Sequence, residues 1–286
     1  MSGTLYLCAT PIGNLEDITF RVINTLKEVD LIAAEDTRHS IKLLNHFEIK
    51  TKMTSYHEYN RVEKAKVLVK QLQEGKNIAL ITDAGTPGIS DPGEELVRQC
   101  HEAGITVTAL PGACALINAL IISGQPTRRF CFEAFLPADK KERKQILDTL
   151  ENETRSIIIY EAPHRLVRTL EELHEVLGDR SMTLCRELTK KHESVFKSTL
   201  GEILAYHKEN APKGECVMII EGKSFQELKE ESQEEFLKIP LSEHMKRYMD
   251  QGHSKKEAMK LVAKDRGVGK LSLIHISEPT RRRGIS

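Results

Sequence analysis

The chain has no excess of charge of either sign: its 286 residues include 42 Lys and Arg against 42 Asp and Glu. This balance excludes a globally basic nucleic-acid-binding protein of the histone type, so any contact with nucleic acid requires local basic patches. Charged residues make up 29% of the chain and hydrophobic residues 40%, which is the balance of a folded protein rather than a disordered one. The length predicts about two domains.

Cysteine pairs of the zinc-binding kind are also missing. None of the six cysteines belongs to a C-x-x-C pair, which argues against a zinc ribbon or finger, and we expect no metal site. Most of the cysteines lie in apolar runs and are expected to be buried free thiols. The sequence shows neither a signal peptide nor an apolar run of membrane-spanning length, which predicts a cytoplasmic protein with no membrane partner.

Glycine-rich nucleotide motifs are absent as well. Neither G-x-G-x-x-G nor G-x-x-x-x-G-K-[ST] occurs, so the dinucleotide-binding and P-loop folds lose their main support.

What the sequence does contain is an alternation of short β-rich runs with amphipathic stretches. The predicted strands are 5–9, 31–34, 78–81, 106–110, 129–135, 156–160, 182–186, 193–198 and 215–221. The predicted helices are 20–28, 40–47, 64–74, 94–102, 140–150, 165–177, 241–249 and 254–264. Such alternation is typical of an α/β fold with a largely parallel sheet.

Breaks in this pattern divide the chain near residues 123–126, where Gly and Pro interrupt it. We predict an N-terminal α/β domain at 1–123, a C-terminal α/β domain at 124–223, and a linker with a helical fragment at 224–270. The acidic start of the last segment is either a linker or a solvated helix, and the helical patterns after it form a plain hairpin or a helix-turn-helix. Residues 271–286 continue no pattern and are expected to be a non-native tail.

Four loops follow predicted strands, and in open α/β sheets ligands bind beyond the carboxyl ends of the strands. The loops are Thr10–Asp17, Glu35–Arg38, Thr82–Gly93 and Leu110–Ala115. The third holds three glycines and two prolines in twelve residues, more than a simple turn needs, which predicts a loop that presents main-chain groups to a ligand. The other loops also fit structural turns or, with Asp36 or Thr37, a helix cap.

Seven motifs occur in a fixed order: TPIGN, AAEDTRHS, DAGTPGISDPG, PGACA, YEAPHR, RELTKK and KGECVMIIEG. From about Leu5 to Gly222 they resemble the tetrapyrrole-methylase-fold superfamily. Within it they resemble the branch that methylates the 2′-hydroxyl of a decoding-region cytidine in 16S ribosomal RNA. The resemblance implies two α/β domains with S-adenosylmethionine in the cleft between them, a homodimer, and 16S rRNA or the small ribosomal subunit as partner.

The same resemblance implies which residues hold the cofactor, largely through main-chain groups. By motif position these are Pro11, Asp83, Gly85, Thr86, Ile89, Ala115, Leu116 and Ala162. Asp83 alternatively only braces its loop.

RNA is held by its phosphates, so basic residues in or beside the motifs are the candidate RNA ligands. They are Arg38, Arg129, Arg165, Arg186 and Lys190. The alternative for each is surface solvation or an ion pair, with Glu161 and Glu187 as the acids.

Transfer of a methyl group to a ribose hydroxyl is assisted when a side chain accepts the hydroxyl proton. The candidate acceptors are Asp36, Glu35, His57, Glu58 and His164, of which Asp36 and His57 are preferred as catalytic residues. Positioning alone, with solvent taking the proton, is the alternative. Two rival functions stay open: a methylase of a corrin or porphyrin precursor, and a non-catalytic RNA-binding ribosome-assembly protein. The EDTR and YEAPHR strings favour the RNA branch.

Overall fold

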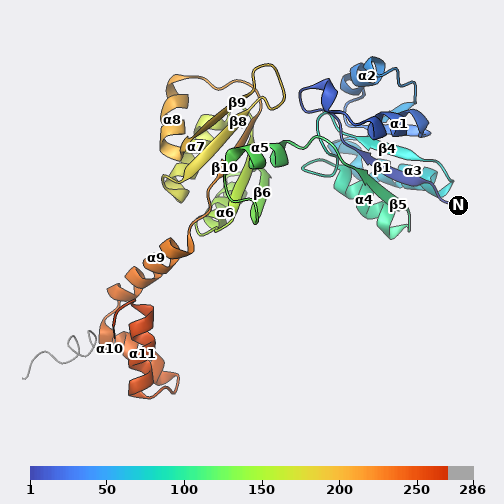
Figure 1. Ribbon diagram of the computed structural model, residues 1–286. Helices are drawn as coiled ribbons and strands as arrows, with labels where there is room; N and C mark the ends of the chain where they lie inside the picture. The colour runs from blue at the N-terminus through green and yellow to red at the C-terminus, as the bar shows by residue number, and fades with distance from the viewer. Residues whose placement is uncertain (270–286) are drawn as a thin grey trace, which may run out of the picture. The chain divides into compact units, whose positions relative to one another are not determined.

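The computed structural model describes residues 1–269 and divides after Glu221 into two compact units (Figure 1). The first unit contains two five-stranded sheets, and the second is helical in its described part. The predicted tail at 271–286 lies outside the described residues. Within 1–269 no helix is long and apolar enough to cross a membrane.

The first sheet is parallel throughout, with the strand order β3-β2-β4-β1-β5. Its strands are β1 (Thr4–Cys8), β2 (Leu31–Ala34), β3 (Met53–Ser55), β4 (Ile78–Ile81) and β5 (Thr106–Leu110). Every residue of β4 is buried, as expected of a central strand covered on both faces. We call this sheet and its helices the first lobe.

Two pairs of helices cover the first sheet. They are α1 (Phe20–Glu28), α2 (Thr37–His46), α3 (Arg61–Gln73) and α4 (Gly93–Glu102). Leu68 and Leu96 of α3 and α4 pack with Ile78, while Leu26 of α1 packs with Ala79 on the opposite face, because successive residues of a strand alternate sides. Two short 3-10 turns, Leu15–Asp17 and Glu58–Asn60, complete the lobe.

The second sheet is mixed, with the order β6-β7-β10-β8-β9. Its strands are β6 (Phe130–Phe135), β7 (Ser156–Glu161), β8 (Ser181–Arg186), β9 (Ser194–Thr199) and β10 (Cys216–Ile220). Only β6 and β7 are parallel; β10 runs antiparallel to both β7 and β8, and β9 runs antiparallel to β8. The prediction of a largely parallel sheet is therefore right for the first sheet and wrong for the second. An apolar run such as that of β10 is buried on both faces in either direction, so its sequence does not encode its direction.

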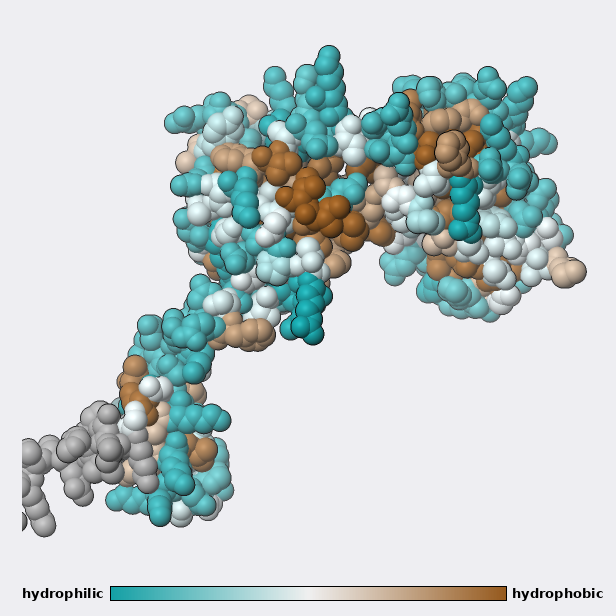
Figure 2. Space-filling model, in the orientation of Figure 1, coloured by the Kyte–Doolittle hydropathy of each residue, from teal (hydrophilic) through white to brown (hydrophobic). Residues whose placement is uncertain are grey.

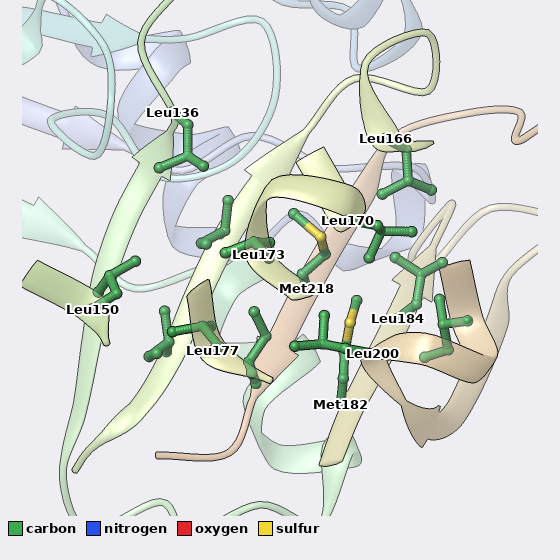
Figure 3. Close-up of a cluster of buried hydrophobic side chains, with 14 of the residues drawn as sticks. Leu136, Leu150, Leu166, Leu170, Leu173, Leu177, Met182, Leu184, Leu200 and Met218 are labelled. Carbon is green, nitrogen blue, oxygen red and sulfur yellow. The ribbon is translucent and has the colours of Figure 1, made fainter. Parts of the chain in front are cut away.

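Helices cover both faces of the second sheet, and together they form the second lobe. They are α5 (Ala115–Ser123), α6 (Lys140–Leu150), α7 (Leu166–Leu177) and α8 (Leu200–Glu209). Figure 3 shows leucines of α7 gathered around Met182 and Met218 of the sheet, in a cluster that α6 and α8 complete. Helix α5 packs on the other face, against Ile158 and Ile219. It precedes the predicted boundary at 123 in sequence, yet its packing partners are in the second sheet.

The second unit consists, in its described part, of α9 (Phe225–Lys238), α10 (Leu241–Asp250) and α11 (Lys255–Asp265). The acidic stretch is thus a helix, capped by Ser224 and Glu227 in a capping box. Helices α10 and α11 pack around a small apolar cluster, and the buried His244 stacks on Phe236 with ring centroids 4.8 Å apart.

Candidate active site

A cavity of about 390 Å³, which we call the main cavity, lies at the carboxyl ends of the parallel strands. From the first lobe it is lined by Ile12 after β1, Glu35 after β2, and the loop after β4. From the second lobe it is lined by the start of α5, the ends of β6 and β7, and the start of β10. Because β10 is antiparallel to β7, its first residues meet the last residues of β7 at this edge. Segments that are distant in the chain therefore line the same main cavity.

The glycine-rich loop after β4 is pinned to its surroundings by hydrogen bonds. Thr10 and Gly85 exchange two main-chain hydrogen bonds of 2.9 and 3.1 Å, and the Thr86 hydroxyl donates to the Ala113 carbonyl at 3.0 Å. Gly85 has a φ of +88° and Gly88 a φ of +86°, a region that favours glycine. The loop thus presents main-chain groups to the main cavity in a fixed conformation.

Asp91 secures the far end of this loop and lines the main cavity. Its carboxylate accepts main-chain N–H groups from Gly88 at 2.8 Å, Ile89 at 3.0 Å and Gly93 at 2.7 Å. Backbone amides, rather than a basic side chain, therefore hold this negative charge in place.

The adjacent acids Glu35 and Asp36 have opposite environments. Glu35 lines the main cavity, where burial, with the charges of Asp83 and Asp91, raises the pKa of its carboxyl above the ordinary value. Asp36 does not line that cavity and caps α2, accepting the Arg38 main-chain N–H at 2.8 Å. Its hydrogen bonds with the Arg38 side chain lower the pKa of Asp36 to about 2. A carboxylate with so low a pKa is a weak proton acceptor, so the predicted base role fits Asp36 poorly.

His57, the other residue predicted to be catalytic, also lies away from the main cavity lining. It caps the short turn Glu58–Asn60, and its Nε2 is 3.3 Å from the Asn60 amide nitrogen. Its Nδ1 is buried without a hydrogen-bond partner among the described residues. The observed contacts are those of a capping histidine.

The second lobe supplies a different kind of lining. Glu161 is fully buried, and its carboxylate accepts the Thr169 hydroxyl at 2.6 Å and pairs with Arg165 at 3.3 Å. Glu215 pairs with Lys190 at 3.1 Å. Here basic side chains outside the lining balance the acids that line the main cavity.

Aromatic residues complete the second-lobe wall. The Tyr160 hydroxyl accepts the Leu116 main-chain N–H at 2.9 Å, which fixes the first turn of α5. Phe132 and Phe135 pack edge-on against the same ring, with centroids 4.9 and 5.6 Å away. Phe135 and Glu215 were not predicted in the lining, although Glu215 lies in the KGECVMIIEG motif, because neither lies in a loop that follows an expected parallel strand.

The lining of the main cavity is acidic, although two of its acids pair with cations outside it. Four carboxylates, from Glu35, Asp91, Glu161 and Glu215, lie among its lining residues, and none of those lining residues is Lys, Arg or His. The rest of the lining is mostly apolar or main chain. Such a hollow suits a small molecule that combines a positive charge with an apolar body.

The residues predicted to hold the cofactor fall into two groups. Five of them line the main cavity: Gly85, Thr86, Ile89, Ala115 and Ala162. Leu116 is buried just behind the lining, whereas Pro11 and Asp83 line a second pocket of about 230 Å³ next to α2. Asp83 accepts the Asp36 main-chain N–H at 3.2 Å, as a residue that braces the loop would.

The five basic residues predicted to bind RNA lie outside the main cavity lining. The Arg38 side chain is 90% exposed, and Arg129 is exposed just before β6. Arg38 also pairs with Asp36 at 2.8 Å. The remaining three are held by second-lobe partners: Arg165 binds Glu161 and the Leu136 carbonyl, Arg186 binds the Lys213 carbonyl, and Lys190 binds Glu187 and Glu215.

Comparison with known proteins shows clear relatives. Residues 4–204 match the tetrapyrrole (corrin/porphyrin) methylases. Ribosomal RNA small subunit methyltransferase I of Synechocystis sp. is 49% identical over 96% of this chain and 97% of its own length. The protein of the same name from Halalkalibacterium halodurans is 50% identical over 96% of this chain and 94% of its own length.

Solved structures with low identity share the fold. Diphthine synthase matches with a TM-score of 0.62 and 14% identity, covering 79% of this chain and 94% of its own. Uroporphyrin-III-C-methyltransferase from Thermus thermophilus matches with a TM-score of 0.55 and 18% identity, covering 76% and 94%.

Proposed function

The chain belongs to the tetrapyrrole (corrin/porphyrin) methylase family, in its branch of ribosomal RNA small subunit methyltransferases, and from that premise we propose its reaction. It transfers a methyl group from S-adenosylmethionine to the ribose 2′-hydroxyl of a cytidine in the decoding region of 16S ribosomal RNA. The observation that carries this proposal is the acidic main cavity beside a glycine-rich loop at the carboxyl ends of parallel strands.

S-adenosylmethionine is the methyl donor of this family, and the residues of the main cavity fit it. The molecule carries a positive sulfonium and a positive ammonium group, and the Asp91 carboxylate, which main-chain amides hold without a basic side chain, would stabilise such a charge. Gly85, Thr86 and Ile89 would hold it from the first lobe, and Ala115 and Ala162 from the second. The other predicted cofactor residues would position these contacts without lining the main cavity. They are Leu116, Pro11 and Asp83. When bound, the cofactor supplies an electrophilic methyl group.

The curated relatives argue against a porphyrin or corrin precursor as the methyl acceptor. Two of them, 49% and 50% identical to this chain over 96% of its length, are named ribosomal RNA small subunit methyltransferase I.

For RNA binding we propose that Arg38 and Arg129 contact phosphates first, since both are exposed. Arg165, Arg186 and Lys190 instead position second-lobe segments through the partners described above. Specificity would come from RNA shape and an unstacked base.

Self-association is proposed through α5. Its Ile117, Ile121 and Ile122 are 42%, 63% and 45% exposed, and Figure 2 shows hydrophobic residues gathered over this helix. An apolar patch of this kind marks an interaction surface, and a second copy of the chain would cover it.

The test of the reaction uses small ribosomal subunits, and separately the free rRNA, from cells that lack the modification. We expect tritium from methyl-labelled S-adenosylmethionine to enter the RNA, and nuclease digestion to release one 2′-O-methylated cytidine. Label in a base would contradict the proposal. Cofactor binding by calorimetry without any transfer would favour the non-catalytic RNA-binding alternative.

A further inference from the structure

Two neighbouring acids follow β2, and the structure separates their surroundings. Asp36 caps the N-terminus of α2 and forms an ion pair with Arg38. Glu35, one residue earlier, lines the main cavity. Two adjacent carboxyl groups whose environments give them different pKa values are suited to different roles in a reaction.

We propose that Glu35 accepts the proton of the RNA hydroxyl during methyl transfer. The inference rests on the proposed function and adds a catalytic residue to it. The hydroxyl oxygen forms a bond to the methyl carbon as the bond between that carbon and sulfur breaks. The bonding electron pair stays on sulfur, which becomes a neutral thioether, and the hydroxyl proton passes to the Glu35 carboxylate.

Two of the other carboxylates of the main cavity, Asp91 and Glu161, have both oxygens engaged, and the third, Glu215, is exposed and paired with a cation. Asp91 accepts three main-chain N–H groups, as described above. Glu161 is held by Thr169 and Arg165, and Glu215 by Lys190. Among the described residues Glu35 has no basic partner, and the main chain of Asp83 is the group that stabilises its ionised form. Glu35 therefore retains acceptor capacity toward the cavity, since a carboxylate has about four acceptor positions.

The charges around Glu35 favour proton acceptance. The acids that face it are Asp36 on its own loop, and Asp83 and Asp91 on the loop after β4. Burial first, and then these like charges, raise the pKa of Glu35, whereas the hydrogen bond with Asp83 opposes the rise. A base with a raised pKa binds a proton more strongly, provided that it is still ionised at the working pH.

The experiment measures single-turnover methyl transfer by Glu35→Gln at saturating cofactor and RNA. We expect the rate to fall by about 10²–10⁴-fold, which is the usual contribution of a general base. Affinity for S-adenosylmethionine, by calorimetry, and affinity for RNA, by filter binding, should change by less than about threefold, well below a 1.4 kcal/mol effect. Glu35→Asp keeps the charge and should restore part of the rate. The matched control is Glu63→Gln on the exposed face of α3, which should behave as the wild type.

The pH profile of the wild type should rise as Glu35 ionises and then level off, and Glu35→Gln should lack that rise. If Glu35→Gln keeps a methyl-transfer rate within a few-fold of the wild type, or still shows the rise with pH, Glu35 is not the proton acceptor. Loss of cofactor affinity overturns it too, because Glu35 would then be a cofactor ligand. A larger loss in Asp36→Asn would assign the base to Asp36. If the wild type binds cofactor but leaves the RNA unmethylated, the proposed function itself fails.

Discussion

The two lobes hold the acids of the main cavity in different ways. In the first lobe, Asp91 is held by main-chain N–H groups and Glu35 has no basic partner among the described residues, whereas in the second lobe Glu161 and Glu215 pair with Arg165 and Lys190, although Glu161 also accepts the Ala162 main-chain N–H. Backbone amides fix a carboxylate without cancelling its charge, but a basic side chain cancels most of it. The first-lobe wall therefore keeps a negative potential that suits a cation and a proton, and the second-lobe wall contributes shape.

The largest expected effect on cofactor binding is that of a substitution in the glycine-rich loop of the first lobe. In Gly85→Val, a β-branched residue must adopt a φ of +88°, and its Cβ would lie 3.3 Å from Ile12 Cγ2. Backbone strain of about 1–3 kcal/mol adds to blockage of the main cavity. We expect affinity for S-adenosylmethionine to fall by about 100-fold or more by calorimetry, where each 1.4 kcal/mol is tenfold.

Gly104→Val is the matched control for that experiment. Gly104 has a φ of +68° in the turn after α4, with no atom within 4 Å of an added Cβ, so it tests strain away from the cavity. It should lower stability and leave cofactor affinity unchanged. Unchanged affinity in Gly85→Val would remove the loop from the cofactor site.

Arg165→Ala tests whether basic side chains stabilise the acids of the second lobe. Removing this arginine leaves the buried Glu161 without its cation. We expect the free energy of unfolding, from urea denaturation, to fall by about 1.5–3 kcal/mol. Arg38→Ala, at an exposed first-lobe arginine, should leave stability almost unchanged. Arg38→Ala should instead weaken RNA binding. It should also reduce the slope of the logarithm of the RNA-binding constant against the logarithm of salt concentration by about 0.7–0.9. The reverse pattern would identify Arg165 as the phosphate ligand.

The smallest expected effect concerns Glu153, a second-lobe acid outside the cavity lining. Its carboxylate binds the Arg155 guanidinium at 2.9 and 2.6 Å, which lowers the pKa of Glu153 to about 2. A lowered folded-state pKa gives stability that is present above the unfolded value of 4.5 and is lost as the pH falls toward 2.

Glu153→Gln should therefore lower the free energy of unfolding by about 0.2–1 kcal/mol at neutral pH, the usual range for a surface ion pair, and the difference should shrink as the pH falls through about 2. Urea titrations at several pH values measure it, with Glu209→Gln at an exposed position of α8 as the control. A difference that does not shrink between neutral pH and pH 2 would contradict the assignment to this ion pair.

Much of the first lobe was predictable because local signals coincide with its elements. The helix Phe20–Glu28 and the strand Ile78–Ile81 have the predicted bounds, since Thr19 caps the helix and the strand is a continuous apolar run. Helix Leu200–Glu209 was not predicted. Thr199 both ends β9 and caps that helix, so no turn residue separates the two elements.

The site was predictable only where a loop follows a parallel strand. On that rule Gly85, Thr86 and Ile89 were expected near the ligand, and they line the main cavity. Glu215 precedes its strand and reaches the cavity only because β10 is antiparallel to β7, which requires knowledge of the sheet. Likewise, two adjacent acids look alike in sequence, so the preference for Asp36 over Glu35 had no basis in side-chain environment.

The strand order also determines how the chain assembles during synthesis. In the second sheet β10 is the last strand made, and it lies in the middle, between β7 and β8. Until Ile220 leaves the ribosome, β7 and β8 each expose an edge that no other strand of the sheet can cover. Unpaired edges of this kind are templates for aggregation. We therefore expect these two strand edges to stay unpaired until the chain is complete to residue 220.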